Sequence, residues 1–432
     1  MRNKYFITTI IAFLAIVNTA FTQNLNTYSP YSRFGIGIIP LQGFGINTSL
    51  GGVSQGIRNP YEINFLNPAS YSAQDSMSFL FDFGVQTNTT SFKGYDQYLN
   101  EQSATNSAGG IHHIAIGFPI TKKWGVSAGI TPYSNVGFRQ IRFETSDSIL
   151  STIGRVKYEN LGTGGITNAY IGTGVSPFHN FSIGANMIYY FGSLDYNTNI
   201  IMPNTAADYS SGYVKSSFAI NDISFSVGAQ YKIDLDKHLK NSVVLGITAD
   251  CPSNINYKRI YSATVVGSSI SDTLTPHSTT SHSFKKPLGI NSGIAFYHSD
   301  NLIIAFDYYV QDWSETEPFN TEQPLGKAQT FKGGIQYTPN PTDLKSYFKK
   351  VNYRIGGYYN KSSIMVNSKQ IDNYGITFGL GLPLKGKTRL NLSFEIGQRG
   401  TNDNYLIKET YGVMNLSISF YDYPWFFKRK YN

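Results

Sequence analysis

Residues 79–86 read Phe-Leu-Phe-Asp-Phe-Gly-Val-Gln, and from Phe79 onward every second residue is apolar while the residues between include Asp82 and Gln86. Successive side chains of a β-strand point to opposite faces, so this spacing predicts a strand with one apolar and one more polar face. The same alternation recurs in residues 181–191, 223–233 and 374–382. The repetition predicts an all-β protein.

Clusters of Gly, Pro, Asn, Asp and Lys divide the chain into fourteen predicted strands. They cover residues 77–92, 111–119, 124–142, 153–177, 181–200, 211–234, 242–262, 276–298, 302–318, 326–338, 351–366, 369–384, 388–400 and 406–421. Short connections alternate with longer polar ones, such as residues 93–110 and 263–275. An even strand number with alternating connection lengths is typical of a transmembrane antiparallel β-barrel.

A soluble propeller or stacked β-sandwich also contains many alternating strands. The strands predicted here are about twice the usual length of five or six residues, which favours the barrel. In lipid a sheet must close on itself, because a free edge would leave backbone N–H and C=O groups without partners. We therefore assign residues 77–421 to one barrel.

The composition fits a barrel better than a soluble enzyme. Charged residues make up only 14% of the chain and aromatic residues 15%, and there are 41 glycines. The mean hydropathy is slightly negative, as expected when apolar residues are confined to alternate positions. The formal charge is +8, but the basic residues are scattered, so we expect lipid headgroup contacts and no nucleic-acid partner.

Residues 1–22 have the features of a secretory signal peptide. Arg2 and Lys4 precede an apolar stretch at residues 6–17 that is short for a spanning helix. We expect cleavage before Gln23, with a retained anchor helix as the alternative. Export through a cleaved signal peptide, together with a barrel, predicts the outer membrane of a Gram-negative cell. Cys251 is the only cysteine, so no intrachain disulfide can form.

Residues 23–76 lack the strand pattern and are rich in Gly, Pro, Asn and Ser. Such a long irregular segment is unusual in a compact domain. A barrel of about fourteen strands has room inside it. We therefore expect this segment to be a hatch or plug in the barrel, with an unstructured periplasmic tail as the alternative.

The third predicted strand contains Pro132, between Gly129 and Gly137. A proline inside a strand cannot donate to the ladder, and a nearby glycine permits a bend. Pro132 and Gly137 are therefore our candidates for a local opening in the barrel wall. A bulge near the rim without a functional role is the alternative.

The sequence offers little catalytic chemistry. His112 and His113 are adjacent on one predicted strand, so we expect their side chains on opposite faces, where they cannot share a metal ion. Asp147, Asp272 and Glu315 lie near predicted rims without a neighbouring base. Asp82, Asp307 and Glu395 fall on the polar, inward face of their predicted strands, where we expect lumen or hatch contacts. We expect no catalytic residue, no metal site, no cofactor and no enzymatic activity.

Residues 422–432 form a predicted periplasmic tail. It contains three aromatic residues followed by three cations, Trp425, Phe426, Phe427, Lys428, Arg429 and Lys430. Aromatic rings at headgroup depth with cations reaching phosphates would make an interface anchor. The alternative is a docking peptide for an outer-membrane or periplasmic partner protein.

One region resembles the FadL/TodX family of outer-membrane transporters for fatty acids and other hydrophobic molecules. The resemblance is carried by the Gly-rich residues 51–56 and by the turn Asn67-Pro68-Ala69, directly before the first strand. It is sharpest over residues 33–85. It implies a fourteen-stranded barrel with an N-terminal hatch ending in an Asn-Pro-Ala turn. The tail and residues 307–313 resemble a branch of such proteins common in Bacteroidetes-type bacteria.

The resemblance implies passive transport of a hydrophobic small molecule, with a side exit at a kinked strand such as the one that contains Pro132. FadL-like barrels can also be accessory subunits of complexes for protein secretion or barrel assembly, and this is our alternative. An apolar tunnel would favour transport. A lumen filled with polar side chains would favour the accessory role.

Overall fold

The computed structural model describes residues 27–423, apart from 97, 204–208, 237–240, 267–270 and 318–322. The strands are β1 Phe79–Tyr95, β2 Glu101–Thr121, β3 Trp124–Phe143, β4 Lys157–Phe178, β5 Phe181–Ile201, β6 Ser211–Asp236, β7 Asn241–Asp250, β8 Ser253–Val266, β9 Ser271–Lys286, β10 Gly289–His298, β11 Leu302–Asp312, β12 Lys327–Tyr337, β13 Asn352–Val366, β14 Lys369–Pro383, β15 Arg389–Arg399 and β16 Lys408–Asp422.

The helices are short. They are η2 Pro30–Arg33, α2 Gly45–Ser49, η3 Pro68–Ala73, α3 Asp147–Thr152, η4 Phe348–Lys350 and η5 Asp403–Tyr405. Within the described residues, none of them is long and apolar enough to cross a bilayer.

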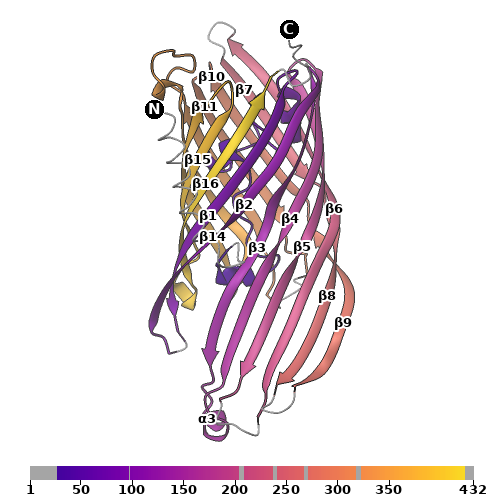
Figure 1. Cartoon of the computed structure of the whole chain (residues 1–432), viewed down its shortest axis with the longest axis vertical. Coiled ribbons are helices and arrows are strands. Elements are labelled where there is room, and N and C mark those ends of the chain that lie inside the picture. The colour runs from indigo at the N-terminus through magenta and orange to yellow at the C-terminus, as the bar shows by residue number, and fades with distance from the viewer. Residues whose placement is uncertain are drawn as a thin grey trace, which may run out of the picture.

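The strands form one closed antiparallel barrel (Figure 1). Sequential neighbours pair around most of the wall, β1 pairs with β16, and the β5–β6 pairing completes the circle. In the described chain the sheet has sixteen strands, but β7 with β8 and β9 with β10 are two interrupted spans, which leaves fourteen spans. Pro252 and Pro287 lie at these interruptions, where a residue without N–H cannot continue the ladder. The predicted fourteen-strand barrel is confirmed.

The two ends of the barrel differ. β1 begins and β16 ends at what we name the terminal end, where most connections are short. At the opposite end, named the loop end, α3 and the tips of β3 to β6, β8 and β9 extend beyond the rest of the wall (Figure 1).

The prediction that residues 93–110 and 263–275 are loops was wrong. β1 and β2 approach each other to a turn at residues 96–100, and β8 and β9 also extend into the predicted loop. The sequence of residues 101–110 has no apolar alternation. Its strand is held by backbone pairing with β1, which leaves no mark on the side-chain pattern.

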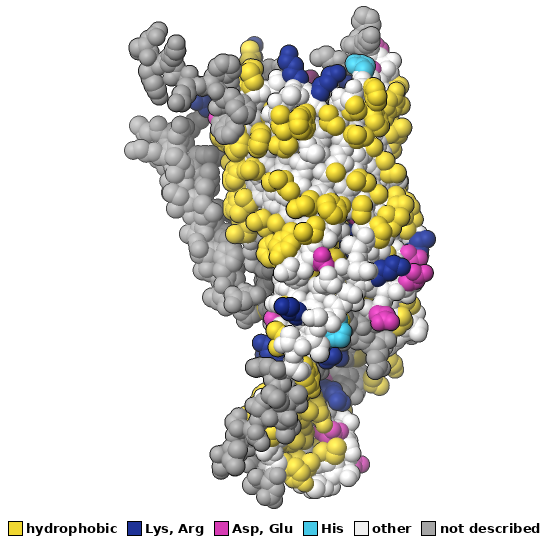
Figure 2. Space-filling model, turned by 90° about the vertical axis from the view of Figure 1, so that its right-hand side faces the viewer, with side chains coloured by type: hydrophobic (Ala, Val, Ile, Leu, Met, Phe, Trp, Pro, Cys, Tyr) yellow, Lys and Arg dark blue, Asp and Glu magenta, His cyan; other side chains and the backbone are white. Residues whose placement is uncertain are grey.

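Outward-facing apolar side chains form a belt around the wall (Figure 2). Exposed members, each on a different span, include Ile114, Ile171, Phe225, Ile294, Phe306, Ile335, Ile376 and Phe394. Charged side chains lie above and below the belt on the face shown. This arrangement suits a barrel with lipid around its middle and water at both ends.

Candidate functional site

The N-terminal segment, residues 27–78, packs against the inward faces of the strands. Phe44, Phe65 and Tyr71 belong to one buried cluster with Leu80 of β1 and Tyr170 of β4. Contacts of η3 and α2 reach strands on both sides of the barrel. Figure 1 shows this indigo segment within the ring of strands. The most buried part of the molecule is thus the contact between this segment and the wall.

Glycines on the wall allow the backbone of the segment to approach closely. A Cβ added at Gly246 would lie 1.9 Å from the carbonyl oxygen of Gln55, and one at Gly184 would lie 2.5 Å from that of Pro68. No real Cβ contact is that short. A side chain at either glycine would therefore push the segment away from the wall.

The predicted turn Asn67-Pro68-Ala69 is buried against β4, β5 and β6. The Asn67 side-chain oxygen accepts from the Ala69 N–H at 3.2 Å and caps η3, while its amide nitrogen donates to the Gln55 carbonyl at 3.0 Å. One side chain thus joins the turn to the preceding loop. The structure places these three residues at the wall of the lumen.

Asp307 of β11 holds the loop at residues 54 and 55. Its Oδ2 atom accepts from the N–H of Ser54 at 2.7 Å and from that of Gln55 at 3.0 Å, and also from the Ser54 hydroxyl at 3.2 Å. The inward orientation predicted for Asp307 is confirmed by its burial. A fully buried carboxylate with several donors is a strong anchor.

A second polar cluster surrounds Glu62. Its carboxylate lies 3.5 Å from the Arg354 guanidinium and 3.8 Å from that of Arg389. Arg354 also donates to Gln336 at 2.7 Å and to Asn391 at 2.7 Å. Both Glu62 and Arg354 have almost no exposed side-chain surface. Sequence reasoning did not identify this cluster, whose only signal was an arginine at an inward position of β13.

His112 and His113 both point into the barrel, so the prediction of opposite faces was wrong. A register shift in the β1–β2 ladder pairs Gly84 with His113 and Val85 with Ile111, which leaves His112 as an extra residue. The bulge turns both rings inward. Their Nδ1 atoms lie 2.7 Å apart.

His113 is the better anchored of the two histidines. Its Nε2 atom lies 2.7 Å from Asp82, and its ring stacks on Phe44 with centroids 4.0 Å apart. Asp82 in turn accepts from Ser419 at 2.7 Å. Among the residues that the structure describes, no three His, Cys, Asp or Glu side chains are grouped as metal ligands.

The wall is incomplete between β2 and β3. Their ladder runs from Thr121 paired with Trp124 to Ile114 paired with Ile130 and ends there. Beyond it, residues 101–113 of β2 pair with β1, and residues 131–143 of β3 pair with β4. We name this separation of the two stretches the seam.

Both candidates for the wall opening lie along the seam. Pro132 is at a register shift in the β3–β4 ladder. The carbonyl of Gly137 accepts from the Ser29 N–H at 2.7 Å, and its N–H donates to the Ser32 hydroxyl at 3.0 Å. The N-terminal segment therefore covers this edge of β3.

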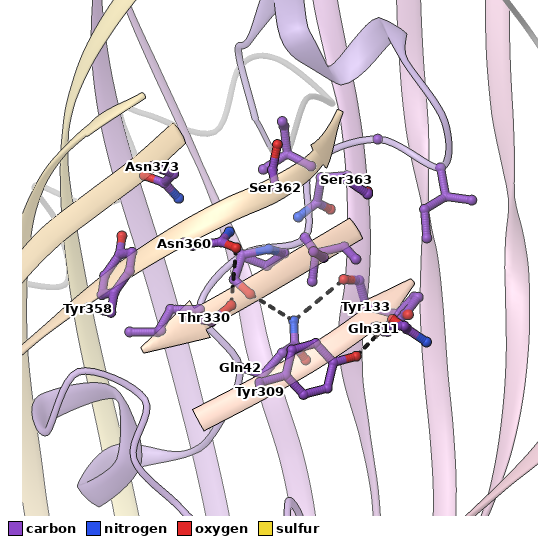
Figure 3. Close-up of a pocket in the computed structure, with 18 of the residues that line it drawn as sticks. Gln42, Tyr133, Tyr309, Gln311, Thr330, Tyr358, Asn360, Ser362, Ser363 and Asn373 are labelled. Carbon is purple, nitrogen blue, oxygen red and sulfur yellow. Dashed lines mark hydrogen bonds between the residues drawn. The ribbon is translucent and has the colours of Figure 1, made fainter. Parts of the chain in front are cut away.

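A cavity of about 290 Å³ lies beside residues 34–42, with wall residues that include Asn88 of β1 and Asn135 of β3, on either side of the seam. Most of its wall residues are amides, hydroxyls and tyrosines. Figure 3 shows Gln42 of the segment reaching the carbonyl of Tyr133 among side chains from β11 to β14. The cavity is thus polar on the wall side, in line with the polar inward faces that the alternation predicts.

The proposed tail residues Trp425, Phe426, Phe427, Lys428, Arg429 and Lys430 lie outside the described residues.

The BamG family model matches residues 1–432. The chain belongs to the BamG family. No curated protein matches it.

Solved structures similar to this BamG family member include FadL-like channels. The toluene transporter TodX of Pseudomonas putida has a TM-score of 0.57 and 16% identity, over 90% of this chain and all of the other. A FadL homologue of Pseudomonas aeruginosa has a TM-score of 0.58 and 13% identity, over 90% and 99%. The CymD monoaromatic hydrocarbon channel has a TM-score of 0.57 and 13% identity, over 88% and 98%. At these identities the likeness is one of fold.

Proposed function

We propose that this chain is an accessory subunit of a barrel-assembly complex in the outer membrane. The BamG family name belongs to that machinery. In this proposal the terminal end faces the periplasm and the loop end faces the exterior, because short turns of such barrels are periplasmic. The N-terminal segment then closes the lumen as a plug, and the protein binds partners through its surface.

The observation that carries the proposal is the set of buried polar bonds that ties the N-terminal segment to the wall of the lumen. Asp307 accepts from Ser54 and Gln55, and Arg354 of β13 lies 3.5 Å from the carboxylate of Glu62 in the segment. Arg58 of the segment donates to Ser182 at 3.0 Å and to Gln230 at 3.2 Å. Opening a path would separate buried charges from their partners, which is costly. A hydrophobic molecule would gain no apolar surface from these groups.

The test is purification of the tagged chain from native membranes in mild detergent, with quantitative mass spectrometry of retained proteins and lipids. We expect a larger assembly barrel at near-equal amount, its reciprocal capture of this chain, and a fall in other outer-membrane barrels when this chain is depleted. Isolation of the chain alone, with unchanged barrel levels on depletion, would contradict the proposal. A variant ending at Asp422 asks whether the tail docks to a partner or only anchors the chain in lipid.

Transport of a hydrophobic small molecule is a second candidate, because the seam offers a lateral route from the interior. It would require residues 29–38 to leave the edge of β3, where the Ile38 and Asn135 backbones exchange hydrogen bonds of 2.9 Å. In a Cys251→Ser background, Ile38→Cys with Asn135→Cys would lock this contact by a disulfide. If transport uses the seam, we expect the disulfide to stop uptake of the hydrophobic small molecule into vesicles and its reduction to restore that uptake. Equal uptake in the oxidised and reduced states would exclude this route.

A further inference from the structure

Of the two strand edges that face each other across the seam, one is paired with a segment of the chain and the other is unpaired among the described residues. The edge of β3 already carries an extended segment of the chain itself, since Ile38 pairs with Asn135 and Ser29 donates to Gly137. Within the described residues, the facing edge of β2 from Glu101 to Gly110 pairs with no strand, because its only ladder there is with β1 on the other side. Strand addition is therefore a mode of binding that this seam already uses.

The edge of β2 lacks the features that normally protect an exposed edge. Residues 101–110 read Glu-Gln-Ser-Ala-Thr-Asn-Ser-Ala-Gly-Gly, without lysine or proline, and their register with β1 has no shift. Proteins usually block such edges with lysine, proline or a bulge. The neighbouring β3 edge has both Pro132 and a bulge. The β2 edge is thus left open to pairing by its sequence.

The position and chemistry of this edge favour a peptide. Ile111 and Ile114 mark the belt on β2, so residues 101–110 lie beyond it on the loop side. Their side chains are small and mostly exposed, so a second backbone can approach. The β1–β2 turn is ordered by Asp96, which accepts from the N–H groups of Tyr98 and Asn100. These bonds, that of Asn100 foremost, hold the pKa of Asp96 below its usual value.

We propose that residues Glu101–Gly110 of β2 are a docking edge for an extended polypeptide segment of a partner protein, presented at the loop end, which adds as a strand. Backbone donors and acceptors supply the affinity. Small side chains on the partner suit the flat surface of this stretch, and a basic residue opposite Glu101 adds a favourable cross-strand pair. The inference does not depend on the assembly role, because purified protein and a peptide suffice to test it.

The test measures binding of two labelled peptides of about ten residues to the full mature chain in detergent micelles. One peptide alternates Thr and Val, and the other has the same sequence with alternate backbone nitrogens methylated. Fluorescence anisotropy gives the affinities. We expect saturable binding of the first peptide and affinity lower by about tenfold or more for the second, because methylation removes several backbone hydrogen bonds.

Two neighbouring variants locate the site. The N–H groups of successive residues in a strand point to opposite edges. Of the variants Thr105→Pro and Asn106→Pro, one therefore removes a hydrogen bond to β1, and the other removes only an N–H donor of the free edge. The variant that keeps the melting temperature of the barrel is the edge-blocking one. We expect it to lose peptide binding by about tenfold, while Asn106→Ala keeps it.

Equal affinity for the plain and methylated peptides would overturn the inference, and so would unchanged binding by the edge-blocking variant. Absence of saturable binding to the wild-type chain would overturn it too. The peptide comparison remains decisive even if both proline variants fail to fold.

Discussion

The belt-bearing half of the barrel and the half near the loop end satisfy their backbone N–H and C=O groups in different ways. At the level of the belt, every strand pairs on both sides and the inside is packed by the N-terminal segment. Beyond Ile130 the wall parts at the seam, and β9 pairs only with β8 among the described strands.

The difference follows from the solvent. Lipid offers no partner for a backbone N–H or C=O, so the belt-bearing half has to close. Water satisfies a free edge at little cost, so the outer half can remain split and keep its edges available. Closure is therefore a requirement of the bilayer, and openness beyond it is available for binding.

The largest expected effect is at the buried ion cluster in the belt-bearing half. Arg354→Ala should lower the free energy of unfolding by about 3–5 kcal/mol, because it leaves the Glu62 carboxylate buried with a weakened partner. Arg139→Ala removes a pair with Glu159 near the loop end, in which the arginine side chain is 60% exposed. It should cost about 0–1 kcal/mol. Urea unfolding in micelles measures both.

Similar losses of unfolding free energy for the two arginine variants would contradict the contrast between a dry belt-bearing half and a hydrated half near the loop end. Matching micelle composition and salt is the necessary control, because an exposed pair is screened and a buried pair is not.

A smaller effect is expected from filling the space used by the segment. At Gly334 an added Cβ would lie 2.6 Å from the Leu50 carbonyl, whereas at adjacent Gly333 the nearest atom is 4.0 Å away. Gly334→Ala should cost about 1–3 kcal/mol, and Gly333→Ala should change stability by about 0.5 kcal/mol or less. Thermal unfolding with intrinsic fluorescence compares them. Equal melting temperatures would mean that the segment gives way freely at Leu50.

The sequence predicted the belt-bearing half well, because lipid imposes alternation on every strand that crosses it. It failed for residues 101–110, where neither face meets lipid and the strand depends on its backbone pairing. The bulge at His112 was missed for a related reason. Alternation assigns faces only while the register is unbroken, and one extra residue reverses the assignment.

The interior was predicted only in outline. Asp307 was placed on the inward face from its neighbours, but its partner Ser54 is 253 residues away in the chain. A single sequence carries no register between the segment and the wall. The high glycine content was a possible signal that the segment lies close to the wall. Gly184 and Gly246 lie at inward positions where any other residue would place a side chain against the segment.

A finer comparison tests the anchor itself. Asp307→Asn keeps the shape and one oxygen but loses the charge that strengthens the bonds from Ser54 and Gln55, so we expect a loss of about 1 kcal/mol. Asp222→Asn is the matched control, because Asp222 accepts from the Asn256 N–H at 2.7 Å on the exposed wall. It should cost about half as much or less. A stabilised Asp307→Asn variant would show that the carboxylate charge is not used as an anchor.

The smallest expected effect is a difference in amide hydrogen exchange within β2, and measuring it requires no mutation. Residues 114–117 of β2 pair with both β1 and β3, so their amide hydrogens should exchange slowly. About half of the amide hydrogens in residues 101–110 point to the free edge and should exchange fast. Hydrogen–deuterium exchange with mass spectrometry should show two phases for residues 101–110 and a single slow phase for the residues of β2 that pair on both sides. On the facing strand, Asn135 and Gly137 should be slow, because Ile38 and Ser32 accept their N–H groups. Slow exchange throughout residues 101–110 would mean that the edge is already paired, and the two halves of β2 would then be alike.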